Sequence, residues 1–174
     1  MADYRLITHW HIEAPLHDVY NTIFHSLEWP SWWRGVIQVQ ECTSGREDGI
    51  GSVRRYIWKS RLPYRLSFDA RTTRIESMAV LEAAVTGDLE GIGRWLFSQS
   101  GAITTVRYEW QVRTTRSWMN LLAPLARFIF RNNHDALMQR GAEGLARQLN
   151  ARLVAVSHTD LPPEPASCMQ YADH

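Results

Sequence analysis

Six strand-like segments follow one another between Val36 and Thr114, and this run constrains the fold more than any other feature of the chain. The segments alternate in polarity, and short turn signals rich in Gly, Ser and Asp separate them. Connections this short join antiparallel neighbours, because a parallel pair needs a crossover of about a dozen residues or more. The predicted strands are Val36–Thr43, Gly51–Lys59, Tyr64–Ile75, Met78–Thr86, Glu90–Gln99 and Ile103–Thr114. The run therefore predicts an antiparallel meander.

A further strand and two short helices precede this run. Residues Tyr4 to Ile12 alternate with strand periodicity, and Ala14-Pro15 ends the alternation. Pro15 suits the first turn of a helix, and apolar residues follow it at helical spacing as far as Leu27. A second helical turn, ending at Gly35, is predicted to carry the cluster Trp29-Pro30-Ser31-Trp32-Trp33.

The period changes again after the meander. Apolar residues recur at helical spacing from Trp118 to Leu153, and Pro124 is expected to kink or bound the first part of this stretch. One long helix is therefore predicted from about residue 117 to residue 153. Three prolines among polar residues beyond Ser157 predict a disordered tail. We expect one domain over residues 1–156, in the order β-α-α-β₆-α, and a tail over residues 157–174.

The composition argues against several classes of function. The 174 residues carry a net charge of +1, so the chain lacks the positive field of a nucleic-acid-binding protein. Cys42 and Cys168 lie far apart, which predicts no disulfide framework and favours a reducing, cytoplasmic location. The start of the chain has no leader pattern and the apolar run at 118–130 is broken, so we expect no stable membrane insertion. We also expect neither a metal nor a cofactor, because no Cys or His pair has zinc spacing.

Several motifs are similar to those of a known superfamily. They are Ile12-Glu13-Ala14-Pro15, Trp29-Pro30-Ser31-Trp32-Trp33, Gly87-Asp88-Leu89-Glu90-Gly91, Trp95 and Val106-Arg107-Tyr108-Glu109-Trp110. With the order of elements, they make residues 3–153 resemble the START-like, helix-grip (SRPBCC) superfamily, and within it polyketide cyclase/dehydrase-like and lipid-transport-like proteins. The resemblance implies an α+β fold in which a curved antiparallel sheet of about seven strands wraps around a long C-terminal helix, with a ligand cavity between them. It implies no catalytic residue, because the superfamily shares none.

Pairing across the predicted hairpins indicates which side chains share a face of the sheet. A two-residue turn at Ser100-Gly101 would place Trp95 opposite Val106 and Gly93 opposite Tyr108. Apolar residues then gather on one face of these two strands and charged residues on the other. A similar pairing after Lys59 turns the aromatic residues of the preceding strand to the same face. The inner face of the sheet is therefore predicted to be aromatic.

These rings predict a cavity. Each ring represents about 150–250 Å² of buried surface, which one helix does not easily cover without gaps. A completely filled core is the alternative. The predicted ligand-binding residues are Trp10, Trp33, Tyr56, Trp58, Phe68, Trp95, Phe97, Tyr108, Trp110, His134 and Met138. The expected partner is a hydrophobic or aromatic small molecule, bound by a monomer or homodimer.

Two polar residues are candidates for catalysis. His134 interrupts the apolar stripe of the long helix, where it could act on a ligand or be a solvated helix position. Glu82 faces the cavity only if a tight turn at Gly87-Asp88 sets the register of its strand. A tight turn at Glu76-Ser77 places it outside, which the cost of burying an unpaired carboxylate favours. His9 and His11 could touch one ion, but no third ligand is evident.

Three functions remain open on these residues. The first is a protein that binds small apolar molecules, such as lipids or polyketide-like compounds. The second is a polyketide cyclase/dehydratase-type enzyme that uses the same cavity through His134, a tyrosine or Glu82. The third is a module that binds a partner protein through the tryptophan cluster. Trp32 and Trp33 cannot face the same way, so at least one is expected to be partly exposed, as a wall or gate of the cavity.

Overall fold

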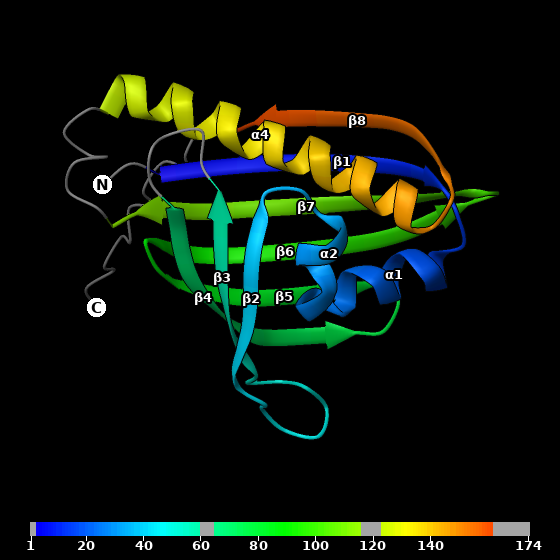
Figure 1. Ribbon diagram of the computed structural model, residues 1–174, viewed down its shortest axis with the longest axis horizontal. Coiled ribbons are helices and arrows are strands. Elements are labelled where there is room, and N and C mark those ends of the chain that lie inside the picture. Colours follow the sequence, from blue (N-terminus) through cyan, green and yellow to red (C-terminus); the bar gives the residue numbers. More distant parts are fainter. Residues whose placement is uncertain (1–2, 60–64, 116–122, 162–174) are drawn as a thin grey trace, which may run out of the picture.

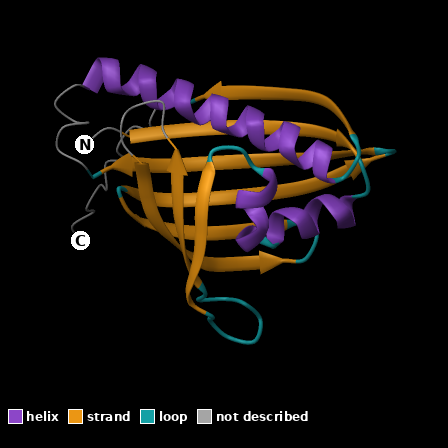
Figure 2. Cartoon of the chain, viewed as in Figure 1, coloured by secondary structure: helices purple, strands orange, loops and turns teal. Residues whose placement is uncertain are grey.

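The computed structural model describes residues 3–59, 65–115 and 123–161, and this part of the chain is a curved antiparallel sheet with helices on one side (Figures 1 and 2). The elements are β1 (Asp3–Glu13), α1 (Leu16–Phe24), the 3₁₀ turn η1 (Ser26–Glu28), α2 (Trp29–Trp32), β2 (Val36–Thr43), β3 (Val53–Lys59), β4 (Arg65–Glu76), β5 (Val80–Gly87), β6 (Leu89–Ser100), β7 (Ile103–Thr114), α4 (Ala123–Gln148) and β8 (Arg152–Asp160). The predicted α+β class is confirmed.

The sheet has eight strands in the order β2-β3-β4-β5-β6-β7-β1-β8, and every neighbouring pair is antiparallel. Each meander strand begins and ends within two residues of its predicted bounds. β2 and β3 run across the direction of β6 and β7 in Figure 1, so the sheet curls around the helices. This curl produces the concave inner face on which the core is built.

The end of the chain differs from the prediction. α4 ends at Gln148, the backbone turns at Asn150 with φ = 49°, and β8 then pairs with the outer edge of β1. The helix was predicted to reach Leu153 because Leu149 and Leu153 continue its apolar spacing. Leu153 instead packs against the core from a strand. The sheet therefore has one strand more than predicted, and the expected domain boundary at residue 156 falls within β8. The tail beyond residue 161 lies outside the described residues.

The faces of the strands are as predicted, but the registers are not. The β6–β7 turn lies at Gly101-Ala102, so Trp95 pairs with Tyr108 and Gly93 with Trp110. This shift of two residues leaves every side chain on its predicted face, because side chains alternate with a period of two. Gly101 has φ = 59°, a conformation that glycine adopts without strain. The β3–β4 pair is shifted in the same way.

The register of β5 decides the position of Glu82. The β4–β5 turn spans three residues, with φ = 61° at Met78, and β4 has a register shift between Thr72 and Arg74. Leu81 then pairs with Trp95, and Glu82 pairs with Arg94. Glu82 is therefore on the outer face of the sheet, as the cost of burying a carboxylate favoured.

The tryptophan cluster joins α2 to α4. Trp29, Trp32 and Trp33 are only 5%, 7% and 0% exposed. The Trp33 indole lies on Gly141 of α4, where an added Cβ would overlap the ring, and its Nε1 donates a hydrogen bond to the Leu137 carbonyl at 2.9 Å. The expectation that one of these tryptophans is partly exposed is therefore wrong. It failed because a glycine on α4 makes room for the ring of Trp33.

Candidate functional site

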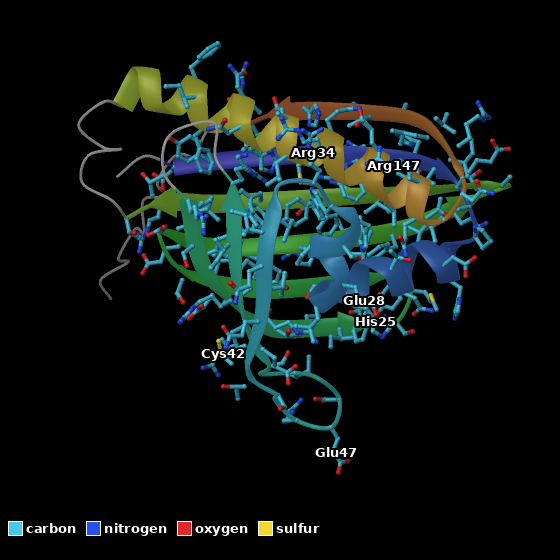
Figure 3. All side chains as sticks on the ribbon, viewed as in Figure 1. His25, Glu28, Arg34, Cys42, Glu47 and Arg147 are labelled. Atoms are coloured by element: carbon cyan, nitrogen blue, oxygen red, sulfur yellow. The ribbon has the colours of Figure 1, made fainter. Side chains whose placement is uncertain are left out.

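A cavity of about 150 Å³ lies between the inner face of the sheet and the α1–α2 segment, and we call it the main cavity because it is the larger of the two cavities lined by the inner aromatic residues. Strands β3 to β7 line one side, and Ile23, Phe24 and Trp29 line the other. The β2–β3 connection, whose tip carries Glu47 (Figure 3), borders the main cavity at Ser44 and Gly49. A cavity of this size accommodates one benzene ring. The main cavity therefore has the size of a ligand of about one ring.

The walls of the main cavity are mostly aromatic. Trp95 and Tyr108 stack with ring centroids 4.0 Å apart. Tyr56 stacks on Phe68 at 5.4 Å, and Trp58 meets the same ring edge-on at 4.8 Å. Contacts of this kind fix the rings relative to one another, because offset and edge-on pairs are the favoured arrangements. The cavity is therefore held open by rings that support each other across strands.

A cluster of three polar side chains, Ser26, Arg54 and Tyr56, lies at one side of the main cavity. The hydroxyl of Tyr56 donates to Ser26 Oγ at 2.8 Å, and Arg54 Nη1 donates to the same oxygen at 2.9 Å. Arg54 Nη2 is 3.8 Å from Glu41 Oε2, while its buried Nε has no partner among the described residues. The guanidinium therefore still has donor capacity next to the cavity. It could orient an oxygen of a ligand.

Both tyrosines of the cavity keep their protons. Burial raises the pKa of Tyr56, and the hydrogen bond with Ser26 only partly opposes this shift. Burial also raises the pKa of Tyr108 well above its ordinary value, and the nearby Tyr56 adds to the shift. Both phenols are therefore neutral at physiological pH. They are suited to hydrogen bonding with a ligand and unsuited to acting as bases.

A second cavity, of about 40 Å³, lies beneath α4. Trp58 and Trp110 line both cavities, so these two indoles form the wall that they share. The remaining lining of the second cavity is Lys59, Leu66, Phe130, Asn133, His134 and Leu137.

No protein-family model matches the chain, and no curated protein matches it in sequence. Solved structures do match it in fold. The Zhui aromatase/cyclase from Streptomyces sp. R1128 superposes with a TM-score of 0.71 at 12% identity, over 86% of this chain and 94% of its own. A START superfamily protein from Mycobacterium smegmatis gives 0.68 at 10% identity, over 84% and 97%. A major latex-like protein from Panax ginseng gives 0.62 at 10% identity, over 84% and 97%. The chain has the START-like helix-grip fold.

The main cavity of this helix-grip protein is not where the resemblance placed it. The expected position was between the sheet and the C-terminal helix, yet the described part of α4 contributes no residue to the main cavity. Only the small second cavity lies there. Trp33 fills the neighbouring part of the space, with its ring centroid 5.4 Å from that of Trp10 and 6.1 Å from that of Trp95. The cavity is therefore displaced toward α1 and α2.

The predicted ligand-binding residues divide into three groups. Those that line the main cavity are Tyr56, Trp58, Phe68, Trp95, Tyr108 and Trp110. His134 lines only the second cavity. The others are buried in the core and line neither cavity: Trp10, Trp33, Phe97 and Met138. These four side chains fill the core.

Sequence reasoning missed part of the lining. Arg54 lies on the same face of β3 as Tyr56 and Trp58, at a spacing of two residues, and this parity could have revealed it. Ser26 and Trp29 gave no such signal, because their position depends on how η1 and α2 fold over the sheet.

His134 is buried, so a solvated helix position is wrong. It is 5% exposed, and its ring stacks on Tyr108 with centroids 6.4 Å apart. Its Nδ1 is 3.6 Å from Asp135 Oδ1, which is also 3.5 Å from His158 Nδ1. Burial alone raises the pKa of Asp135, but the two histidines and Arg131 outweigh it and lower the net value.

The carboxylate of Glu82 has a structural partner. Although Glu82 borders the main cavity along β5, its carboxylate accepts hydrogen bonds from Arg94 Nε at 2.7 Å and Thr73 Oγ1 at 3.0 Å. Partial burial raises the pKa of Glu82, and these hydrogen bonds more than reverse the shift. Glu109 joins the same ion-pair network through Arg94. Glu82 is therefore a charged residue of the outer face and makes a poor acid or base for the cavity.

Two further expectations concern metals and membranes. Among the described residues, His9 and His11 stack with centroids 6.4 Å apart, and no group of three metal-binding side chains forms. No described helix is long and apolar enough to cross a membrane.

Proposed function

We propose that the protein binds small apolar or aromatic molecules in the main cavity. The observation that carries this proposal is an aromatic-walled cavity of about 150 Å³ with hydrogen-bonding groups at its side. Ligand sites are commonly apolar pockets with a few placed polar groups. The likeness of fold to the proteins above is compatible with such a role but does not by itself assign it.

The size of the cavity sets the expected ligand and affinity. A single-ring compound would bury roughly 200 Å² of apolar surface, which contributes about 5 kcal/mol before the costs of association. Binding near the millimolar range, about −4 kcal/mol, is therefore expected for a plain ring. A ring that also carries a hydrogen-bond acceptor for Arg54 should bind more tightly. Two- and three-ring compounds bind only if the α1–α2 segment or the β2–β3 connection moves.

A matched pair of substitutions on β5 tests the proposal. Ala83 lines the main cavity, and Ala84 lies on the opposite face of the same strand. Calorimetric titration with 4-ethylphenol should show binding to the wild type and to Ala84→Leu, and none to Ala83→Leu. Equal affinity in all three proteins would mean that the ligand binds elsewhere. Absence of binding by single-ring compounds to the wild type would refute the proposal itself.

The second candidate is an enzyme of the polyketide cyclase/dehydratase type acting in the same cavity. Fold similarity to the Zhui aromatase/cyclase favours it. Since both tyrosines stay neutral and Glu82 is paired outside, His134 is the side chain best suited to proton transfer. It lines only the second cavity, so a substrate in the main cavity would have to reach it past the shared wall of Trp58 and Trp110. Turnover of a poly-β-keto substrate that is lost in His134→Gln would support this function. The third candidate, a partner-binding module, required an exposed tryptophan cluster. The cluster is buried, so no observation favours this candidate.

A further inference from the structure

Three residues that line the second cavity beneath α4 carry polar atoms without a hydrogen-bond partner among the described residues. Trp58 Nε1, Trp110 Nε1 and both ring nitrogens of His134 are shielded from solvent and have no hydrogen-bond partner among the described residues. The three side chains are 5%, 2% and 5% exposed. Buried indoles and imidazoles normally find partners, because an unsatisfied buried group costs about 1–3 kcal/mol.

Other tryptophans of the same core show what a satisfied indole looks like. Trp29 Nε1 donates to the Ile23 carbonyl at 3.0 Å, and Trp33 Nε1 donates to the Leu137 carbonyl at 2.9 Å. Trp10 Nε1 and Trp32 Nε1 also lack a partner among the described residues, but neither side chain lines a cavity. Trp58, Trp110 and His134 differ from these because all three line one small cavity. A small molecule in the second cavity could therefore supply the hydrogen-bond partner that these groups lack.

Trp110 lies between the two cavities, and its ring rests on Gly93. Its Cζ3 and Cε3 atoms lie over Gly93, at 2.7 and 2.9 Å from where a Cβ would be. Gly93 lines the main cavity. In an indole, Nε1 is on the edge opposite Cε3, so the N–H is on the edge of the ring that is farther from Gly93. His134 lines only the second cavity. Trp110 and His134 therefore both border the second cavity.

The charge of Asp135 favours one tautomer of His134. Its Oδ1 is 3.6 Å from His134 Nδ1, and a carboxylate on that side favours the proton on Nδ1. His134 Nε2 is then a hydrogen-bond acceptor. The second cavity therefore offers an N–H donor from Trp110 and an acceptor from His134, with Trp58 as a second donor in the wall.

We propose that the second cavity is a binding site for a hydroxyl group. A hydroxyl oxygen accepts from the Trp110 indole N–H, and its proton is donated to His134 Nε2. Neither a carbonyl nor a carboxylate satisfies both partners, because each only accepts. A volume of about 40 Å³ holds two or three water molecules, or one small alcohol. Water and an alcohol supply the same chemistry, and this site is separate from the main cavity.

Proton NMR of the indole groups tests this proposal and separates the two sources of the hydroxyl. In protein labelled with ¹⁵N-tryptophan, the eight indole N–H signals are assigned by single Trp→Phe substitutions. The Trp110 signal should show a cross-peak to bound water, whereas those of Trp29 and Trp33 should show none. Titration with methanol then reports on the second source. A shift of the Trp110 signal means that an alcohol can replace water, and a water cross-peak without a shift assigns the site to water alone.

Two variants complete the test. His134→Leu removes the acceptor and should abolish the water cross-peak and any response to methanol, while the Trp33 signal shows that the fold is kept. If His134→Leu does not fold, His134→Gln retains an acceptor and should retain the cross-peak. Ala83→Leu fills only the main cavity and should leave the Trp110 signal unchanged, so this site can fail or hold independently of the proposed function. A Trp110 indole with neither a water cross-peak nor a methanol response would overturn the proposal.

Discussion

The packing of Trp33 on Gly141 predicts that the substitution Gly141→Ala destabilises the protein. On an exposed helix this change would stabilise by about 1 kcal/mol, because alanine has the higher helix propensity. Here the added Cβ overlaps Cε2, Cζ2 and Nε1 of the Trp33 indole. Trp33 is 0% exposed and has no free space to move into. The overlap should cost about 1–3 kcal/mol in packing and about 1 kcal/mol in the weakened hydrogen bond to Leu137.

The net loss expected for Gly141→Ala is therefore about 1–3 kcal/mol of unfolding free energy. For a chain of this size it corresponds to a decrease in Tm of about 3–10 °C. Urea and thermal unfolding followed by circular dichroism would measure both quantities.

A double-mutant cycle with Trp33→Leu separates the contact from other effects of Gly141→Ala. Leucine has no ring to overlap the new Cβ, so in this background Gly141→Ala should be neutral or stabilising by up to about 1 kcal/mol. The coupling energy should be about 2 kcal/mol. If Gly141→Ala has the same effect in both backgrounds, or stabilises the wild type, Trp33 does not rest on Gly141 as described.

Three further predictions concern the cavity and the charged groups around it. Ala83→Leu should leave the free energy of unfolding unchanged or raise it by up to about 2 kcal/mol, because the new methyl groups enter a cavity. A decrease of about 2 kcal/mol in urea unfolding would indicate a filled core instead. Glu82→Gln should leave calorimetric ligand affinity unchanged, because the carboxylate is bonded on the outer face, and a tenfold change would place it at the site. Burial lowers the pKa of His158 below its ordinary value of 6.5, so the unfolded chain binds the proton more readily and stability should fall as the pH drops below that value. Unfolding measured between pH 5 and 8 should be less pH-dependent in His158→Gln, and identical profiles would contradict this assignment.

The sheet could be predicted from the sequence because strand periodicity and turn residues act locally. β2 was predicted from Val36 to Thr43 and is found there. The pairing of Trp95 with Val106 was off by two residues, yet both rings and charges fell on the correct faces. A register shift of two residues leaves each side chain on the same face of the sheet. The register itself depends on the conformation of a single turn.

The failures arose where distant segments meet. Leu153 matched the helical stripe of α4 but belongs to β8, because the free edge of β1 provides a partner that no local pattern reveals. The cavity was expected under the long helix, but only the small second cavity lies there, and Trp33 fills the neighbouring space because Gly141 admits its ring. His134 was correctly singled out as a break in an apolar stripe, but its burial depends on the face that α4 turns toward Tyr108. These features are set by tertiary packing, which overrides local preference.

The most direct test of the central claim is a crystal structure of the protein soaked with 4-iodophenol. The anomalous signal of iodine locates the ligand without reference to the side chains. The proposed function predicts an iodine site inside the main cavity, among Tyr56, Phe68 and Trp95, with the phenol oxygen toward Arg54. A cavity that stays empty at saturating 4-iodophenol, or iodine bound only on the outer surface, would contradict it.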